Sequence, residues 1–160
     1  MAGETTQLFL EDFSKGQIFP GHARKITEAD VLSFAALTGD KHPIHYDDEY
    51  ARTTRFGRPI VHGLHLMALT AVGAAPLSQQ LEHSMIALLG QRASFHKPVF
   101  KDDTVQSQFE IEEIDHQAGR EWGKLKVKVR LINQRGETVL EGRHLYRLRC
   151  RAVTTAHGDS

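Results

Sequence analysis

The chain has 160 residues, of which 40% are hydrophobic and 25% charged, a size and composition typical of one globular domain with its own core. Lys and Arg number 20 and so do Asp and Glu, and this zero formal charge argues against nucleic acid as the main partner. A single cysteine, Cys150, cannot form an internal disulfide. No signal peptide or membrane span is evident, so a cytoplasmic protein without a membrane partner is expected.

The predicted elements begin with a strand over residues 17–25 and a helix after it. Thr27 is a typical N-cap residue, and Asp30 follows three positions later as the acid of a capping box. Gly39 is expected to end this helix. An acidic run at residues 47–49 predicts the start of a second short helix, because carboxylates are favourable at the positive end of a helix dipole.

A third helix is predicted over residues 63–77. Its apolar side chains fall on all sides rather than on one stripe, which is typical of a helix buried in a core. Apolar and polar residues then alternate over residues 105–112, 124–131 and 146–151, which indicates antiparallel strands with one face in the core. Residues 133–136 have the composition of a hairpin turn.

An early buried helix followed by an antiparallel meander predicts an α+β domain in which the sheet covers the helix. No repeat or long linker divides the chain. Residues 1–160 are therefore expected to form a single domain, with loose ends at about residues 1–6 and 154–160. Because an exposed strand edge needs a partner, a homodimer or an assembly of dimers is expected.

Two neighbouring motifs carry most of the chemical information. Residues 39–45 read Gly-Asp-Lys-His-Pro-Ile-His, which places the Asp40 carboxylate five residues before the His45 imidazole, across a proline that prevents one continuous helix. Residues 58–63 read Arg-Pro-Ile-Val-His-Gly and lead into an uncharged segment. A carboxylate with an imidazole can move protons near neutral pH, and a glycine amide at a helix start can donate to an oxyanion.

Taken alone, Asp40 and His45 could be a turn residue and a histidine that serves only structure. Two features favour catalysis. Pro43 and the β-branched Ile44 stiffen the connection, which holds the two side chains at a fixed separation. The second motif then supplies Gly63 independently.

The two motifs resemble those of the MaoC-like, (R)-specific enoyl-CoA hydratase family. The resemblance continues through residues 94–100 and 103–105 and covers roughly residues 15–149. Where the family usually has an asparagine, this chain has His42. The resemblance implies a hot-dog fold, an antiparallel sheet wrapped around a central buried helix, and two such folds paired into one continuous sheet with the site near the junction.

The implied reaction is the reversible hydration of trans-2-enoyl thioesters to (R)-3-hydroxyacyl thioesters, carried on coenzyme A or an acyl carrier protein, with no cofactor. His45 is expected to take the proton of the attacking water. Asp40 would position that water and help return a proton to C2, while the Gly63 N–H would bind the thioester oxygen. Three more residues are expected to support the substrate site: His42, Pro43 and His62, the last by anchoring its loop through a backbone hydrogen bond.

Three alternatives stay open. A hot-dog thioesterase would use a similar carboxylate and helix-start amide, and a non-catalytic acyl-thioester-binding or partner subunit would leave them idle. A metal site is disfavoured because Pro43 breaks helical ligand spacing and no zincin-type motif is present, so no metal is expected. Its ligands would come from Asp40, His42, His45, His62 and His65.

Overall fold

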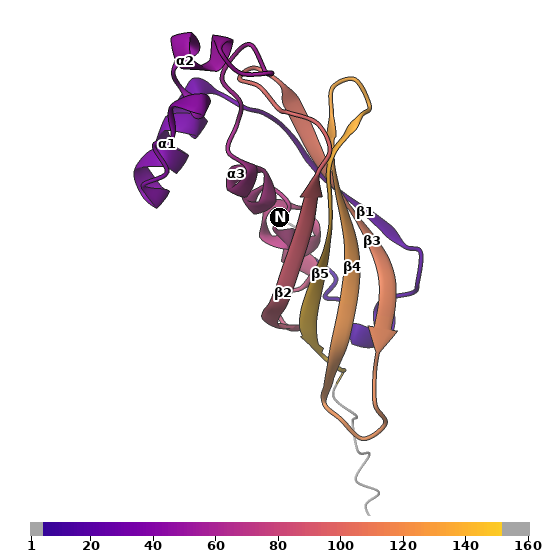
Figure 1. Ribbon diagram of the computed structural model, residues 1–160. Helices are drawn as coiled ribbons and strands as arrows, with labels where there is room; N and C mark the ends of the chain where they lie inside the picture. Colours follow the sequence, from indigo (N-terminus) through magenta and orange to yellow (C-terminus); the bar gives the residue numbers. More distant parts are fainter. Residues whose placement is uncertain (1–4, 152–160) are drawn as a thin grey trace, which may run out of the picture.

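The computed structural model describes residues 5–151, and its main feature is a five-stranded antiparallel sheet with helices on one side (Figure 1). The strands are β1 (Ile18–Lys25), β2 (Met85–Phe95), β3 (Thr104–Asp115), β4 (Trp122–Asn133) and β5 (Thr138–Arg149). The α-helices are α1 (Glu28–Thr38), α2 (Asp48–Arg52), α3 (Gly63–Ala68) and α4 (Leu77–Gln80). Short 3-10 helices are η1 (Leu10–Asp12), η2 (Pro43–His45) and η3 (Val72–Ala74). The order of strands is β1-β3-β4-β5-β2, so β1 and β2 are the sheet edges.

This arrangement confirms the predicted α+β architecture. Side chains of β4 and β5 alternate as the sequence predicts, because a strand turns successive residues to opposite faces. Leu125 and Val129 of β4 and Leu148 of β5 are almost fully buried, while the lysines and arginines between them reach solvent. None of the helices within residues 5–151 is long and apolar enough to cross a membrane. The predicted loose ends lie, apart from residues 5 and 6, outside the described residues.

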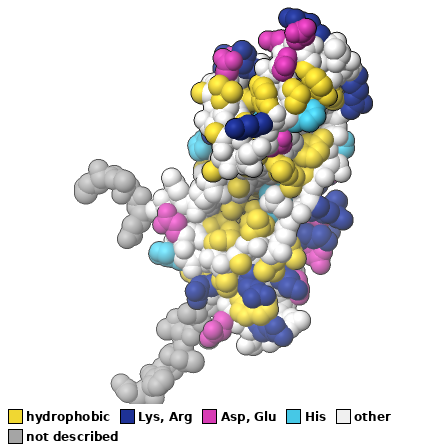
Figure 2. Space-filling view, turned by 60° about the vertical axis from the view of Figure 1, so that its left-hand side comes forward, with side chains coloured by type: hydrophobic (Ala, Val, Ile, Leu, Met, Phe, Trp, Pro, Cys, Tyr) yellow, Lys and Arg dark blue, Asp and Glu magenta, His cyan; other side chains and the backbone are white. Residues whose placement is uncertain are grey.

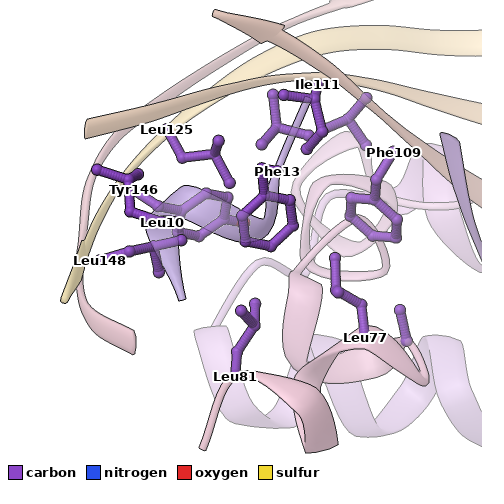
Figure 3. Close-up of a cluster of buried hydrophobic side chains, with 12 residues drawn as sticks. Leu10, Phe13, Leu77, Leu81, Phe109, Ile111, Leu125, Tyr146 and Leu148 are labelled. Carbon is purple, nitrogen blue, oxygen red and sulfur yellow. The ribbon is translucent and has the colours of Figure 1, made fainter. Parts of the chain in front are cut away.

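The inner face of the sheet is covered by side chains from distant parts of the chain (Figure 3). Leu77 of α4 and Leu81, the residue after α4, approach from one side, while Leu10 and Phe13 enter from the N-terminal segment. They meet Phe109, which is fully buried on β3. Each such side chain contributes about 1.5–3 kcal/mol when it is removed from water. Burial of this face therefore holds the N-terminal segment and α4 against the sheet.

The first helix forms as its sequence signals predict. Thr27 accepts a hydrogen bond from the Asp30 N–H, and the Asp30 carboxylate accepts one from the Thr27 N–H, which completes the capping box. Gly39 ends the helix in the left-handed conformation, with φ of 75°. The chain therefore leaves α1 in a defined direction at Asp40.

The prediction of one helix over residues 63–77 is wrong. The structure breaks it into α3, the 3-10 turn η3 and α4. Pro76 explains part of this break, because a proline ring clashes with the carbonyl group four residues earlier in a helix. The Thr70 hydroxyl also donates to the Met67 carbonyl oxygen at 2.6 Å, a local bond that competes with helical pairing.

The expectation that this segment is buried all round is also wrong for the single chain. Leu64 is 61% exposed, and only His65 and Leu66 of α3 are buried. Patterning predicts no element over residues 85–95, yet β2 forms there as an edge strand with two register shifts against β5. Both faces of β2 carry apolar residues, so the period-2 alternation that marks the other strands is missing.

Candidate active site

The two sequence motifs come together beyond the C-terminus of α1. Pro43 is the first residue of η2, a position where the lack of an N–H loses no helical hydrogen bond. The His42 Nδ1 atom accepts a hydrogen bond from the Ile44 N–H at 3.3 Å. The His42 N–H lies 3.4 Å from Asp40 Oδ1, which it donates to. His42 therefore acts on the backbone of this turn, and η2 turns His45 toward the second motif.

His45 is fixed by the second motif. Its Nδ1 lies 2.8 Å from the carbonyl oxygen of Ile60. Because a carbonyl oxygen only accepts, Nδ1 carries the proton, and Nε2 of the neutral ring has a free lone pair. Burial lowers the pKa of His45 below its ordinary value, although the Ile60 carbonyl opposes this. The ring is therefore held as a neutral base at neutral pH.

His62 connects the two catalytic candidates. It is only 1% exposed, and its ring stacks on that of His45 with centroids 3.8 Å apart and planes at 25°. Its Nε2 lies 3.1 Å from the backbone oxygen of Asp40, to which it donates. One side chain thus contacts the His45 ring and the Asp40 backbone, which is the geometry of a loop anchor. The supporting role of His62 in the site stays a prediction.

Gly63 is the first residue of α3, and its N–H has no acceptor among residues 5–151. First-turn donors of a helix lack intrahelical partners, so this N–H is free for another acceptor. A Cβ added at Gly63 would lie 3.0 Å from Cζ of Phe95, at the end of β2. The aromatic ring, half exposed, therefore lies directly against the glycine.

Asp40, His45 and His62 are also the residues of this region that could hold a metal. Each offers a ligand atom within 4.8 Å of the others, whereas His42 and His65 are not part of the group. The hydrogen bonds described above occupy Nδ1 of His45 and Nε2 of His62. The atoms left are Nε2 of His45, the buried Nδ1 of His62 and the Asp40 carboxylate. The same free atoms suit acid–base chemistry without a metal.

A hollow of about 210 Å³ adjoins His45 and gives it access from solvent. Its walls are mixed: Val31, Leu32, Ile60 and Phe100 are apolar, while Glu28, Asp48, Arg58, Lys101 and Asp102 are charged. Asp40 and Gly63 do not line it. The imidazole is therefore the group of the site that faces this hollow.

Two aromatic residues of the site were missed by sequence reasoning. Phe34 of α1 lies between His62 and His65, with ring centroids 5.0 Å from each. Its position on the inner side of α1, beside Val31, was the signal that could have found it. Phe95 lies in the matched stretch 94–100, but only the folded chain brings it to Gly63.

Comparison with known proteins shows which family has a similar sequence. The MaoC like domain family matches residues 15–134. An (R)-specific enoyl-CoA hydratase from Aeromonas caviae is 42% identical over 89 residues, which are 56% of this chain and 64% of that protein. A 3-hydroxybutyryl-CoA dehydratase from Methylorubrum extorquens is 32% identical over 114 residues, 71% of this chain and 70% of that one. The match thus spans less than two thirds of the first relative.

Solved structures agree with these matches. A monoamine oxidase regulatory protein from Archaeoglobus superposes with a TM-score of 0.85 at 29% identity, over 93% of this chain and 99% of that one. A Mycobacterium tuberculosis protein with a double hot-dog fold superposes with a TM-score of 0.75 at 20% identity, over 96% of this chain and 48% of that one. At this identity the likeness concerns the fold alone. The predicted hot-dog fold is confirmed, and the chain belongs to the MaoC like domain family.

Proposed function

We propose that this protein catalyses the reversible hydration of trans-2-enoyl thioesters to (R)-3-hydroxyacyl thioesters. The observation that carries the proposal is the neutral His45 ring, locked by the Ile60 carbonyl with Nε2 free. The Asp40 loop is tied to the same ring through His62. The names of the matched relatives, an enoyl-CoA hydratase and a 3-hydroxybutyryl-CoA dehydratase, support the same reaction in its two directions.

Each group has one role in the proposed reaction. Nε2 of His45 takes a proton from water as the water oxygen bonds to C3 of the enoyl group. Asp40 accepts a hydrogen bond from that water, and the pair returns one proton to C2, so that a complete water molecule is added. The thioester oxygen gains negative charge during attack, and the Gly63 N–H donates to it. Dehydration runs through the same groups in reverse.

Coenzyme A is proposed as the carrier of the acyl group, because the names of both relatives above specify a coenzyme A thioester. An acyl carrier protein is the alternative. No metal or cofactor is part of the proposal, because a base, a carboxylate and an amide donor suffice for this addition.

We also propose a homodimer formed through the free edge of β2. Within residues 5–151 this strand pairs only with β5, and the backbone groups on its other side have no strand partner there. Exposed apolar residues accompany this edge: Leu64 of α3, and Ile86, Leu88, Leu89 and Phe95 of β2. Figure 2 shows apolar side chains over the face that the helices and β2 occupy. The other edge, β1, contains Pro20, which has no N–H to donate to a strand partner, so it is the poorer pairing surface.

The first prediction concerns the catalytic pair. Asp40→Asn and His45→Ala are each expected to reduce turnover of a short enoyl-CoA about a hundredfold or more, because positioned acid–base groups are typically worth about 10² to 10⁴ in rate. The near-ultraviolet absorbance of the enoyl thioester and a free-thiol reagent are followed together. A hydratase changes only the first, a thioesterase releases thiol, and a binding protein does neither. Chiral analysis of the product tests the (R) configuration.

His42→Asn is the matched control for these variants. His42 contacts the backbone of η2 rather than holding a free base, so this variant should keep most of the activity. A loss as deep as that of His45→Ala would mean that the catalytic imidazole has been misassigned. Turnover at the wild-type rate by either Asp40→Asn or His45→Ala would contradict the proposed mechanism.

The second prediction is a pH dependence. His45 must be neutral to act as a base, and burial lowers its pKa, so the neutral form persists below the ordinary imidazole value of about 6.5. The acid limb of the kcat/KM profile, which reports the free protein, should therefore have its midpoint below that value. Circular dichroism over the same range checks that the protein stays folded. A midpoint clearly above 6.5 would show that another group controls the rate.

The third prediction separates two reasons for glycine at position 63. Gly63→Ala should lower turnover, because its methyl group would crowd both Phe95 and a thioester approaching the N–H. Phe95→Ala and the double variant complete a double-mutant cycle. If the glycine serves only packing, removal of the ring will restore the double variant to the rate of Phe95→Ala. If the N–H binds the thioester oxygen, the double variant will remain impaired.

The fourth prediction concerns assembly. Light scattering should give twice the chain mass of 18.0 kDa for the wild type. Leu88→Glu places a charge on the free edge of β2 and should yield monomers, while Ile18→Glu, at a similarly exposed position on β1, should leave the dimer intact. A wild-type monomer, or a dimer that only the β1 variant dissociates, would rule out the β2 interface.

A further inference from the structure

A second group of potential ligands lies at the end of the sheet opposite α1 and α2. Glu11 belongs to η1, His116 follows the last residue of β3, and Cys150 follows the last residue of β5. Their ligand atoms all lie within 4.8 Å of one another. In Figure 1 the N-terminal 3-10 helix, in indigo, lies low on the sheet, far from α1 and α2. This group is therefore separate from the site around His45.

The backbone under these three residues is well fixed. Leu10, beside Glu11, is 1% exposed and packs so closely on Gly123 that a Cβ there would clash with it. The Cys150 N–H donates to the carbonyl oxygen of Glu121 at 2.8 Å, which joins the end of β5 to the start of β4. His116 directly follows a residue of β3 that is still paired with β4. The three side chains thus project from a rigid frame, as a preformed metal site requires.

The local charges favour a cation between these side chains. The Arg151 N–H donates to the carboxylate of Glu11, at 3.2 Å from Oε1 and 3.1 Å from Oε2. The Arg151 guanidinium is paired with Asp12, and Glu11 forms no salt bridge with any of residues 5–151. Cys150 is a free cysteine of intermediate exposure, and its sulfur is one of the three grouped ligand atoms. A divalent ion with one carboxylate, one thiolate and a neutral imidazole would be electrically neutral.

We propose that Glu11, His116 and Cys150 form a zinc-binding site that joins the N-terminal segment to the far ends of β3 and β5. Zinc accepts thiolate, imidazole and carboxylate ligands in tetrahedral geometry, with a water molecule as the fourth. Calcium and magnesium prefer oxygen ligands alone, and a thiolate selects against them. Binding replaces the thiol proton of Cys150, which leaves to solvent, with no change of oxidation state. The expected role is structural, because the ligands bridge segments distant in sequence.

Cobalt(II) is the probe for the test, because thiolate ligation gives an intense near-ultraviolet charge-transfer band. The full-length protein, first freed of metal with a chelator, should bind one Co²⁺ with this band, and Zn²⁺ should displace it. The cluster of Asp40, His45 and His62 contains no sulfur, so it cannot produce the band. Cys150→Ser should abolish the band, while Glu11→Gln and His116→Gln, which remove ligands, should weaken zinc binding by at least the roughly 10- to 100-fold that loss of an outer-shell partner costs.

His22→Gln removes an exposed imidazole elsewhere and serves as the control, with unchanged affinity. Calorimetry in two buffers should detect release of about one proton per zinc ion. Zinc at about a hundred times its dissociation constant should raise the melting temperature of the wild type but not of the three ligand variants. The metal-free melting temperatures show whether each variant is folded. Absence of the band, or unchanged zinc affinity in folded Glu11→Gln and His116→Gln, would overturn the site.

Discussion

The candidate site depends on one short segment, residues 60–63, being fixed to the body of the domain. The Val61 N–H donates to the carbonyl oxygen of Val99 at 2.8 Å, and Ile60 forms an isolated β-bridge with Phe100. From this fixed segment the Ile60 carbonyl holds His45, and the His62 ring holds the Asp40 backbone. Gly63 then begins α3. A shift of this segment would therefore move the base, the carboxylate loop and the amide donor together.

The same region brings together several imidazoles, and burial decides how they can be used. Burial lowers the pKa of both His45 and His65. The His62 ring, stacked on that of His45 with centroids 3.8 Å apart, also lowers the pKa of His45. Neutral rings can stack, can direct one nitrogen to a carbonyl and can leave the other free. The cluster is thus suited to accept a proton and return it.

The strand order of the hot-dog sheet also explains why apolar surface is exposed at one edge. The strands β3, β4 and β5 are each paired on both sides, so their apolar inner faces and polar outer faces are settled within the chain. The edge strand β2 and the neighbouring Leu64 expose apolar surface instead. Such surface is unusual on a stable monomer and is typical of an interface. The proposed dimer would place this interface directly beside Gly63 and Phe95.

Local sequence signals predicted what depends on local physics. The capping box of α1, its glycine stop and the alternation of β3, β4 and β5 rest on neighbouring residues and on backbone geometry, and the structure confirms them. The resemblance of two motifs, separated by only 12 residues between His45 and Arg58, was enough to identify the family that the comparisons confirm. The candidate site residues came from the same motifs, and their catalytic roles stay predictions.

Other features were decided only by tertiary structure. The break of the segment after Ala68 follows in part from the local signal of Pro76, but it also involves Thr70, whose hydroxyl lies 3.3 Å from the ring nitrogen of His144, a residue 74 positions away. The strand β2 has no alternation because it is an edge with apolar residues on both faces, and its pairing with β5 depends on a distant partner. Contact of Phe95 with Gly63, and of Phe34 with His62, likewise follows from long-range packing. Periodicity records which face of a segment is buried in its own chain, but it carries no information about which distant residue will lie against that face.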